Sequence, residues 1–496
     1  MEDIYYKITN MSLSQALFPQ CEKTAYVRPS YKGKVDKNEL NSYRPISNLS
    51  YLSKIIETAV SDQTWQHLDV EKLIPDEQSA YRPNRSTETA LRSMMNHMIE
   101  IVNKDSCGLL VMLDLSAAFD TVDHALLLGD LKSMGIEDDV YRWYESYLKD
   151  RNMVIKVSDA ISEPVTQPRG VPQGSVLGPT LFTMYTADLA KILEKHMLEF
   201  VLYADDTQFC FPIRNLDEAY KKLEEVMSDI RKWMLDKKLK LNEDKTECML
   251  FGSTNALINY ENVKTVKIGS EEIKLVSVVK NLGVYVDDKL MMKQQILHTV
   301  KVCNYHIRNI AHIRKYLDVD TLKMVIYNYV ITRLDYCNSL YHGLPNCILK
   351  KLQNILNRAA RLITGLKLRE RVTPSLIDLH WLPIKARIES KLCLMVYKVL
   401  KCDEPCYLRK DLLPFELDTT MNLRHADDTH RLFEPRTYNK LGDRAFASCA
   451  PRLYNKLPIQ LKNMNDVVQF KKKLKTFLFE SCYDTTDARI TASYKT

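Results

Sequence analysis

The sequence has few residues that interrupt regular structure, and it has no long apolar segment. Only 13 glycines and 18 prolines occur among 496 residues, which argues against long flexible linkers. No apolar run approaches the roughly 18–20 residues that a membrane-spanning helix needs. The first twenty residues also lack a basic region followed by an apolar core, so they do not resemble a secretory signal. We therefore expect an intracellular protein, nuclear or cytoplasmic, without a membrane segment.

The cysteine pattern argues against a zinc finger. Twelve cysteines are scattered along the chain, with no Cys-x-x-Cys pair and no Cys/His set at zinc-finger spacing. Cys402 and Cys406 are four residues apart, but no second pair of ligands follows at a fitting distance. We expect free, mostly buried thiols in a reducing compartment.

The overall charge is only weakly informative. Lys and Arg total 70 against 63 Asp and Glu, so the formal net charge is +7. This mild excess permits nucleic-acid binding without requiring it. Hydrophobic residues make up 45% of the chain and charged residues 27%, which is typical of a globular protein with a large core.

The residue pattern changes character at Cys107. The preceding residues predict helices and short extended segments, whereas residues 108–113 form an apolar run, typical of a buried strand, that ends at Asp114. Two short strands at 200–203 and 207–211 flank Ala-Asp-Asp, which predicts a hairpin. Further on, the pattern predicts helices at 124–134, 176–196 and 216–238, strands at 153–157, 248–251 and 281–286, and mostly helices after residue 290.

Asp114 and the pair Asp205–Asp206 are the candidate metal ligands. The residues beside them are apolar, so these acids are expected at the edge of a core. Joining nucleotides needs two Mg²⁺ ions about 4 Å apart, and Mg²⁺ prefers carboxylate oxygens held on rigid elements. A single Asp-Asp pair is more often a polar turn. That alternative weakens because both acidic segments occur in order, with a glycine-containing segment between them.

Seven segments of the sequence resemble motifs of reverse transcriptases, especially those of animal non-LTR retrotransposons. Three are similar to successive palm motifs: VMLDLSAAFDTVDH (111–124), RGVPQGSVLGPTLF (169–182) and LYADDTQF (202–209). Two resemble fingers motifs (31–57 and 78–91), and two resemble the segments that close the palm, LKLNEDKTECMLFG (239–252) and VKNLGVYVDDKL (279–290). The tail, at 380–391 and 448–458, resembles the C-terminal region of chicken-repeat-like and jockey-like elements.

The resemblance implies an α+β, right-hand polymerase whose palm is an antiparallel sheet backed by helices. Its expected parts are fingers at 1–107, palm at 108–288, a helical thumb at 289–370 and a mainly helical extension of unknown role at 371–496. The implied activity is RNA-directed DNA polymerisation. It would use an RNA template, a DNA primer, deoxynucleoside triphosphates and two Mg²⁺ ions, with Mn²⁺ as an alternative ion. The sequence does not indicate protein partners.

The resemblance also implies roles for individual residues. Asp114, Asp205 and Asp206 correspond to the metal ligands, with the backbone carbonyl of Leu115 as a further ligand. The other implied roles are a grip on the triphosphate by Arg44, selection of deoxyribose by Phe119, support of the new base pair by Gln173 and Gly174, protonation of pyrophosphate by Lys245, and contacts with the template backbone by Arg82 and Arg85. Asp123 is expected to cap the following helix. Lys32, Lys34 and Lys37 lie near Arg44, and no role is assigned among them.

Several alternatives remain open at this point. Phe119 could be a plain core residue, the cations around Arg44 a solvated loop, Pro-Gln-Gly a simple turn, and Lys245 a phosphate ligand. An RNA-dependent RNA polymerase would share the palm, but Tyr-Ala-Asp-Asp and the bulky Phe119 argue against it. No endonuclease precedes the polymerase motifs, so a truncated copy is expected. The competing function is an inactive or unexpressed relic that binds nucleic acid at most.

Overall fold

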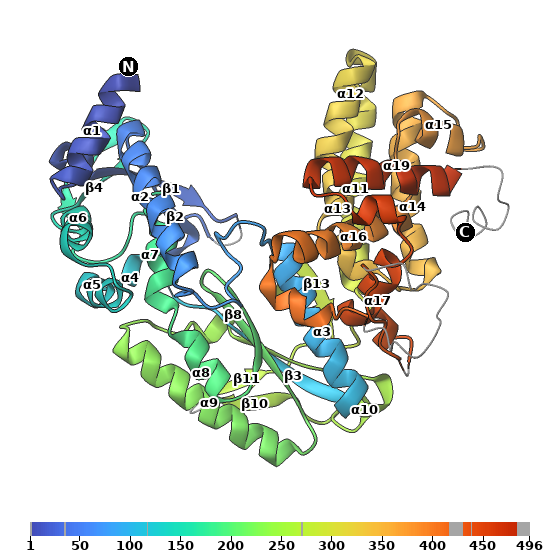
Figure 1. Cartoon of the computed structure of the whole chain (residues 1–496), viewed down its shortest axis with the longest axis horizontal. Helices are drawn as coiled ribbons and strands as arrows, with labels where there is room; N and C mark the ends of the chain where they lie inside the picture. The colour runs from blue at the N-terminus through green and yellow to red at the C-terminus, as the bar shows by residue number, and fades with distance from the viewer. Residues whose placement is uncertain are drawn as a thin grey trace.

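The computed structural model describes residues 2–33, 36–116, 118–268, 271–415, 430–437 and 439–483. Two arms rise from a base that contains the main β-sheet (Figure 1). The first arm holds α1 (Glu2–Ser14), β1 (Thr24–Tyr31), β2 (Tyr43–Asn48), α2 (Tyr51–Val70), α5 (His124–Ser133), α6 (Asp138–Leu148) and β4 (Asn152–Val157). The second arm consists of helices from the C-terminal half of the chain.

The main sheet has the strand order β7-β8-β3-β9, and all its neighbouring pairs are antiparallel. Its strands are β3 (Cys107–Leu113), β7 (Glu199–Tyr203), β8 (Asp206–Pro212) and β9 (Glu247–Gly252). Successive side chains of a strand point to opposite faces. Accordingly, Leu109 and Val111 of β3 belong to one hydrophobic core, and Leu110 belongs to another. The sheet therefore lies between two cores, which explains the continuous apolar run of β3.

Helices build these two cores on either side of the sheet. Helix α3 (Thr87–Asp105) packs against β3, β7 and β8, and shares a core with Leu110. Helix α9 (Leu216–Asp236) contributes its apolar side to the core that contains Leu109. The expected antiparallel sheet backed by helices is thus present.

A second sheet supports the first arm. Its order is β2-β1-β4-β5, with β6 (Val165–Thr166) also paired to β4, and β5 spans Ala160–Ile161. Strands β1 and β2 form an antiparallel hairpin in which Ser30 faces Arg44, whereas β1 and β4 run parallel.

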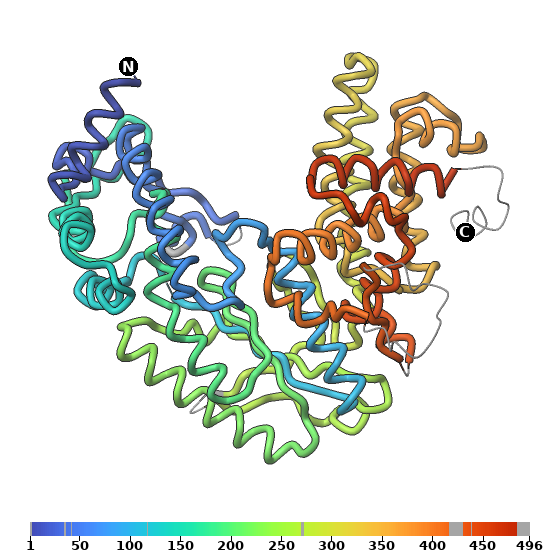
Figure 2. The backbone as a smooth tube through the Cα atoms, in the orientation of Figure 1, coloured from blue at the N-terminus to red at the C-terminus, as the bar shows by residue number. Residues whose placement is uncertain are grey.

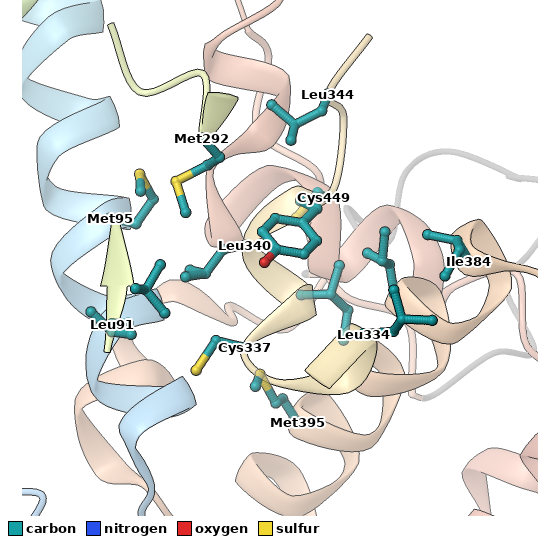
Figure 3. Close-up of a cluster of buried hydrophobic side chains, with 14 of the residues drawn as sticks. Leu91, Met95, Met292, Leu334, Cys337, Leu340, Leu344, Ile384, Met395 and Cys449 are labelled. Carbon is teal, nitrogen blue, oxygen red and sulfur yellow. The ribbon is translucent and has the colours of Figure 1, made fainter. Parts of the chain in front are cut away.

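The second arm is helical and returns to the base of the molecule. Its main helices are α11 (Lys293–Ile313), α12 (Val319–Ile326), α13 (Thr332–Asp335), α14 (Asn346–Thr364), α15 (Thr373–Asp378), α16 (Ile384–Cys402), α17 (Phe446–Tyr454), α18 (Ile459–Lys462) and α19 (Val467–Tyr483). The tube in Figure 2 shows red and orange C-terminal segments beside the blue helix α3. Figure 3 shows the shared core, where Leu91 and Met95 of α3 lie near Leu340, Met395 and Cys449. The C-terminal region is therefore packed into the same core as the base.

Two predicted elements differ from the structure. The helix expected at 176–196 is divided into α7 (Leu177–Thr186) and α8 (Leu189–Lys195), because hydrogen bonds of three-residue spacing, such as Ala187 N to Met184 O, interrupt the α-helical pattern. The strand expected at 281–286 is a hairpin of β12 (Val278–Asn281) and β13 (Val284–Asp287). Leu282 and Gly283 both have positive φ, which suits a two-residue turn.

Two compositional expectations can be compared with the structure. All twelve cysteines are free, and eight of them are buried. Within the described residues, no helix is both long enough and apolar enough to cross a bilayer.

Candidate active site

The register of the main sheet brings Asp114 next to the Asp205–Asp206 hairpin. Leu113, the last residue of β3, pairs with Thr207 of β8, so Asp114 and Asp206 follow at adjacent strand ends. Opposite residues of antiparallel strands have Cβ atoms about 4.5–5.5 Å apart. Tyr203 pairs with Asp206, and Ala204 and Asp205 form the two-residue turn between them. Residues separated by 91 positions in the chain thus meet at one edge of the sheet.

The pKa values of Asp205 and Asp206 are both raised. Burial raises the pKa of Asp205, and the negative charge of Asp114 adds to this effect. Burial, followed by the charges of Asp205 and Asp114, raises the pKa of Asp206 to about 6. Asp206 is exposed when the whole residue is considered, so solvent screens part of this effect. Carboxylates that repel one another in this way are stabilised by a shared cation.

Asp114 is oriented by the segment that precedes β9. Its Oδ2 accepts hydrogen bonds from Asn242 Nδ2 at 2.9 Å and from Lys245 Nζ at 3.2 Å. The backbone of this segment is held as well, since Asn242 N donates to Asp114 O and Ser116 N donates to Lys240 O. Leu115 and Leu241 lie opposite each other in an antiparallel bridge. The two hydrogen bonds of this bridge are made by the residues on either side of them, so neither involves the carbonyl of Leu115.

The acids fit a hard divalent cation by their chemistry. Among the described residues, no group of three or more His, Cys, Asp or Glu side chains is already arranged as a complete metal site. However, the ammonium of Lys245 lies beside Asp114 Oδ2, where its positive charge takes the place of a metal ion. The donors are carboxylate oxygens on strand ends, which are the ligands that Mg²⁺ prefers. Metal binding would therefore favour the ionised forms of Asp205 and Asp206 and would require Lys245 to move away from Asp114.

A second group of predicted residues lies around the loop 169–174. Phe119 is half-buried and stacks on Phe182 of α7, with ring centroids 4.6 Å apart. Its carbonyl accepts a hydrogen bond of 2.9 Å from Val171 N. Gln173 Nε2 donates to Asp120 Oδ2 at 2.8 Å, although burial raises the pKa of that carboxyl. The segment that follows Asp114 is thereby tied to the loop.

Gly174 is required by both backbone conformation and space. Its φ is +119°, which L side chains rarely adopt, and a Cβ atom would lie 2.5 Å from Ser47 O. Next to it, Ser47 N donates to Gln173 O at 2.7 Å. The loop therefore contacts strand β2 directly.

Arg44 is the predicted cation on β2. It is exposed, and its positive charge lowers the pKa of Asp205, which opposes the larger raising effect of burial. Lys37 Nζ lies 5.7 Å from the ring centroid of Tyr31. Lys34 lies outside the described residues, so none of the three neighbouring lysines is distinguished.

Comparison with known proteins gives the family of the chain. The family model for reverse transcriptase (RNA-dependent DNA polymerase) matches residues 34–286, which is more than half of the sequence. The chain belongs to this family. The resemblance in the motifs is thus confirmed.

Relatives of this reverse transcriptase come from mobile elements. It is 27% identical over 397 residues to "Probable RNA-directed DNA polymerase from transposon BS" of Drosophila melanogaster, covering 77% of this chain and 42% of the relative. It is 28% identical over 295 residues to "RNA-directed DNA polymerase from mobile element jockey" of the same species, covering 58% and 31%. These relatives support a jockey-like non-LTR reverse transcriptase. The chain spans less than half of the length of both relatives.

Solved structures are only distantly similar. Apo telomerase from Candida tropicalis covers 99% of this reverse transcriptase and 73% of its own chain, at 10% sequence identity and a TM-score of 0.41. A likeness of this size carries no further conclusion.

The side chains of Arg82 and Arg85 form contacts within the protein. The Arg85 side chain has 0% relative exposure, and its Nε donates to Glu404 Oε2 at 3.1 Å. Arg82 has 9% side-chain exposure and donates to Pro75 O and Asp69 Oδ1. The contacts of both residues with template phosphates stay a prediction, since these donors bond within the protein in this conformation of the reverse transcriptase. Both residues brace the loop that precedes α3.

Sequence reasoning missed two residues that hold the acids. Asn242 bonds to Asp114 through side chain and backbone, and it lies in the motif segment 239–252 that carries Lys245. Gln78 is 2% exposed, and its Oε1 accepts a hydrogen bond of 3.2 Å from Ala204 N in the acidic hairpin. The available signal was that Asn242 and Gln78 both lie within motif segments, 239–252 and 78–91. By contrast, Asp123 caps α5 as predicted, since its Oδ1 accepts from Ala125 N and Leu126 N.

Proposed function

We propose that this chain is an RNA-directed DNA polymerase that adds deoxynucleotides to a primer 3′-hydroxyl on an RNA template. The observation that carries the proposal is the strand register that brings Asp114 beside Asp205 and Asp206. Divalent metal ions are general cofactors of the family. The finer assignment of two Mg²⁺ ions, with Mn²⁺ as an alternative, rests on the chemistry of phosphoryl transfer.

The acids would hold the ions through Asp114, Asp205 and Asp206, with the carbonyl of Leu115 as a further ligand. When bound, such ions stabilise negative charge on the attacking and leaving oxygens. Lys245 starts on Asp114 Oδ2 at 3.2 Å, so it is close enough to pass to the leaving pyrophosphate once the carboxylate has a metal partner. There it donates a proton or binds the phosphate. Arg44, whose positive charge acts on Asp205, supplies a planar guanidinium suited to bidentate binding of the triphosphate.

The loop 169–174 and Phe119 would receive the sugar and base of the incoming nucleotide. Phe182 stacks on the ring of Phe119, with centroids 4.6 Å apart. Phe119 is nevertheless only half-buried, so part of its surface remains accessible. An accessible ring beneath the sugar would collide with a ribose 2′-hydroxyl. Gln173 and Gly174 would support the new base pair, since the glycine allows close approach of the backbone.

The nucleic-acid partners would bind the helical second arm. Helix α11 and the residues that follow it expose several cations, namely Lys293, Lys301, Arg308 and Lys315. Tyr305 and Tyr316 are 60% and 75% exposed in the same region. Cations that contact phosphates release bound counter-ions, so the affinity for primer–template should fall steeply with salt. The division into fingers (1–107), palm (108–288), thumb (289–370) and C-terminal extension (371–496) stays a proposal.

The test is primer extension on an RNA template with deoxynucleotides and Mg²⁺. The unmodified chain should extend the primer, and Asp114→Ala should abolish extension while leaving the thermal unfolding temperature almost unchanged, because loss of one acid relieves repulsion. The matched control is Asp130→Ala, which removes an acid that pairs with Lys237 Nζ at 2.6 Å on α5, outside the acidic cluster. Mg²⁺-dependent synthesis by Asp114→Ala at the unmodified rate would contradict the proposal. Absence of extension by the unmodified chain, despite intact binding of primer–template, would favour an inactive relic.

A further inference from the structure

A short loop forms an additional strand-like partner for the acidic hairpin. This loop 76–80 lies before α3, and Gln78 forms a parallel bridge with Leu202 of β7. Leu202 N donates to Glu77 O at 3.1 Å, and Ser79 N donates to Leu202 O at 2.9 Å. The side chain of Gln78 reaches further, to accept a hydrogen bond from Ala204 N in the turn itself. Loop 76–80 therefore fixes the hairpin up to the residue before Asp205.

The opposite side of loop 76–80 is held by a segment of the C-terminal region. The hydroxyl of Tyr407, in η7 (Cys406–Asp411), accepts from Ser79 Oγ at 3.1 Å and donates to Thr89 Oγ1 at 2.8 Å. Arg85 Nη1 donates to Gln78 O at 3.1 Å, while Arg85 Nε donates to Glu404 Oε2 at 3.1 Å. These contacts join residues more than 300 positions apart in the sequence.

The hydrogen bonds of the Tyr407 hydroxyl are buried, so water cannot replace them easily, whereas the Arg85–Glu404 pair is partly buried. Ser79 is 2% exposed, Thr89 and Tyr407 are 6% exposed, and the Arg85 guanidinium lies 5.5 Å from the Tyr407 ring centroid. A buried polar group that loses its partner remains unsatisfied and favours a local shift of the backbone. Such a shift at Ser79 or Gln78 is transmitted to β7, because both residues bond to that strand or its turn.

We propose that the C-terminal residues Glu404 and Tyr407 are positioning residues for the acidic hairpin, acting through loop 76–80. This role rests on the proposed function, in which Asp205 and Asp206 bind the metal ions. It assigns a function in catalysis to part of the extension 371–496, which carries none of the implied catalytic residues. Neither Glu404 nor Tyr407 contacts substrate or metal in this arrangement.

The test uses variants that each remove a single hydroxyl group, which makes two hydrogen bonds in Tyr407 and is the donor of one of these in Ser79. Tyr407→Phe keeps the ring near Arg85 but removes the hydroxyl, and Ser79→Ala removes the same hydrogen bond from the other side. The matched control is Tyr397→Phe on α16, which removes a comparable hydroxyl that donates to Met464 O at 2.8 Å, away from loop 76–80. The three variants and the unmodified protein all comprise the 496-residue sequence.

Two measurements decide the proposal. Hydrogen exchange at the amides of Leu202 and Ala204 should become about fivefold faster in Tyr407→Phe and Ser79→Ala, the equivalent of one lost hydrogen bond. In the same variants, the Kd for Mn²⁺, measured by electron paramagnetic resonance without nucleotide, should rise about 3–10-fold. This is less than the roughly 10–100-fold typical of residues that bond directly to metal ligands, because Tyr407 and Ser79 act through loop 76–80. Tyr397→Phe should show neither change, even if its unfolding temperature falls.

The outcomes separate this proposal from the proposed function. Unchanged exchange at the hairpin in both variants would overturn the positioning role. Faster exchange with an unchanged Mn²⁺ affinity would also overturn it, because the contact would then be structural only. If the unmodified chain binds no Mn²⁺, the metal-dependent function fails, and with it the claimed role in positioning metal ligands, whatever the exchange rates show.

Discussion

The tetrapeptide Tyr-X-Asp-Asp occurs twice in this chain, in two different environments. In Tyr-Ala-Asp-Asp (203–206), the acids lie at a hairpin tip beside Asp114, and the pKa of Asp206 is raised to about 6, mainly by burial. In Tyr-Val-Asp-Asp (285–288), the first acid ends strand β13 and precedes α11. There, Asp287 Oδ1 accepts from Met291 N at 2.8 Å, and Oδ2 accepts from Lys293 N at 3.0 Å.

The difference shows that the partners of an acid decide its role. Asp287 is 8% exposed and has backbone N–H groups for both oxygens, so its charge is satisfied within the protein. Asp205 and Asp206 instead repel each other and Asp114, and an external cation would relieve this repulsion. The first tetrapeptide is therefore suited to binding a ligand, and the second to fixing the start of a helix.

Neutralising each acid pair in turn tests the difference between the two tetrapeptides most directly. Asp205→Asn with Asp206→Asn should lower primer extension by about 10³-fold or more, because metal binding supplies several kcal/mol of stabilisation to the transition state. Asp287→Asn with Asp288→Asn should retain synthesis below its unfolding temperature. Single-turnover rates on an RNA template measure both. Equal losses in the two double variants would contradict the distinction.

A second experiment leaves the acids intact and changes the ring expected beneath the sugar. Phe119→Val should lower the discrimination between deoxy- and ribonucleotides about 10²-fold, or ~3 kcal/mol, by making room for the 2′-hydroxyl. Incorporation efficiencies for paired deoxy- and ribonucleotides give this ratio. If Phe119 is only a core residue, its replacement costs about 1–3 kcal/mol of stability and leaves the ratio unchanged.

The raised pKa of Asp206 predicts a pH dependence that the second tetrapeptide should not share. Below about pH 6, Asp206 holds a proton that a metal ion must displace, so Mn²⁺ affinity should rise up to tenfold per pH unit from pH 5 to 6 and level off above. Titrations at several pH values measure this. Asp206→Asn should flatten the curve, and Asp287→Asn should leave its midpoint in place.

The same group affects stability with a known sign. The folded-state pKa lies above the unfolded value of about 3.9, so ionised Asp206 opposes folding above pH 6, and this penalty disappears as the pH falls toward 4. Its magnitude is reduced by solvent because the residue is exposed.

The smallest effect concerns the stability of the two sites without metal. Asp287→Ala removes the acceptor of the Met291 and Lys293 amides and should lower the free energy of unfolding by about 1–2 kcal/mol. Asp205→Asn removes repulsion and should raise it slightly or leave it unchanged. Urea denaturation at pH 7 compares them. A larger loss of unfolding free energy in Asp205→Asn than in Asp287→Ala would contradict the difference between the two tetrapeptides.

Local features of the fold could be predicted from the sequence because they depend on neighbouring residues. The apolar run of β3, the hairpin at Asp205 and the cap at Asp123 all follow from short patterns. The division of the helix at 176–196 was missed, because nothing in its apolar spacing marks the change in hydrogen-bond spacing near Ala187.

Long-range contacts account for the rest of what was missed. An arginine in a fingers motif suggests a phosphate partner, so the sequence predicts that Arg85 contacts the template. Its partner within the protein, Glu404, lies 319 residues away, and no periodic pattern in one sequence encodes such a pairing. The motifs identified the candidate acids, but Asn242 and Gln78, which hold the backbone and side chains around them, became apparent only from the contacts.

The contact between Gly174 and Ser47 has a mechanical consequence. A Cβ atom at position 174 would lie 2.5 Å from Ser47 O, and Gln173 O already receives the Ser47 amide. The loop proposed to support the new base pair therefore contacts strand β2 through backbone atoms at Ser47. Ser47 is three residues from Arg44 on the same strand. A side chain at position 174 would push strand β2 away from the loop 169–174. Arg44, which is proposed to bind the triphosphate, and the surface proposed to support the base pair would then both be displaced.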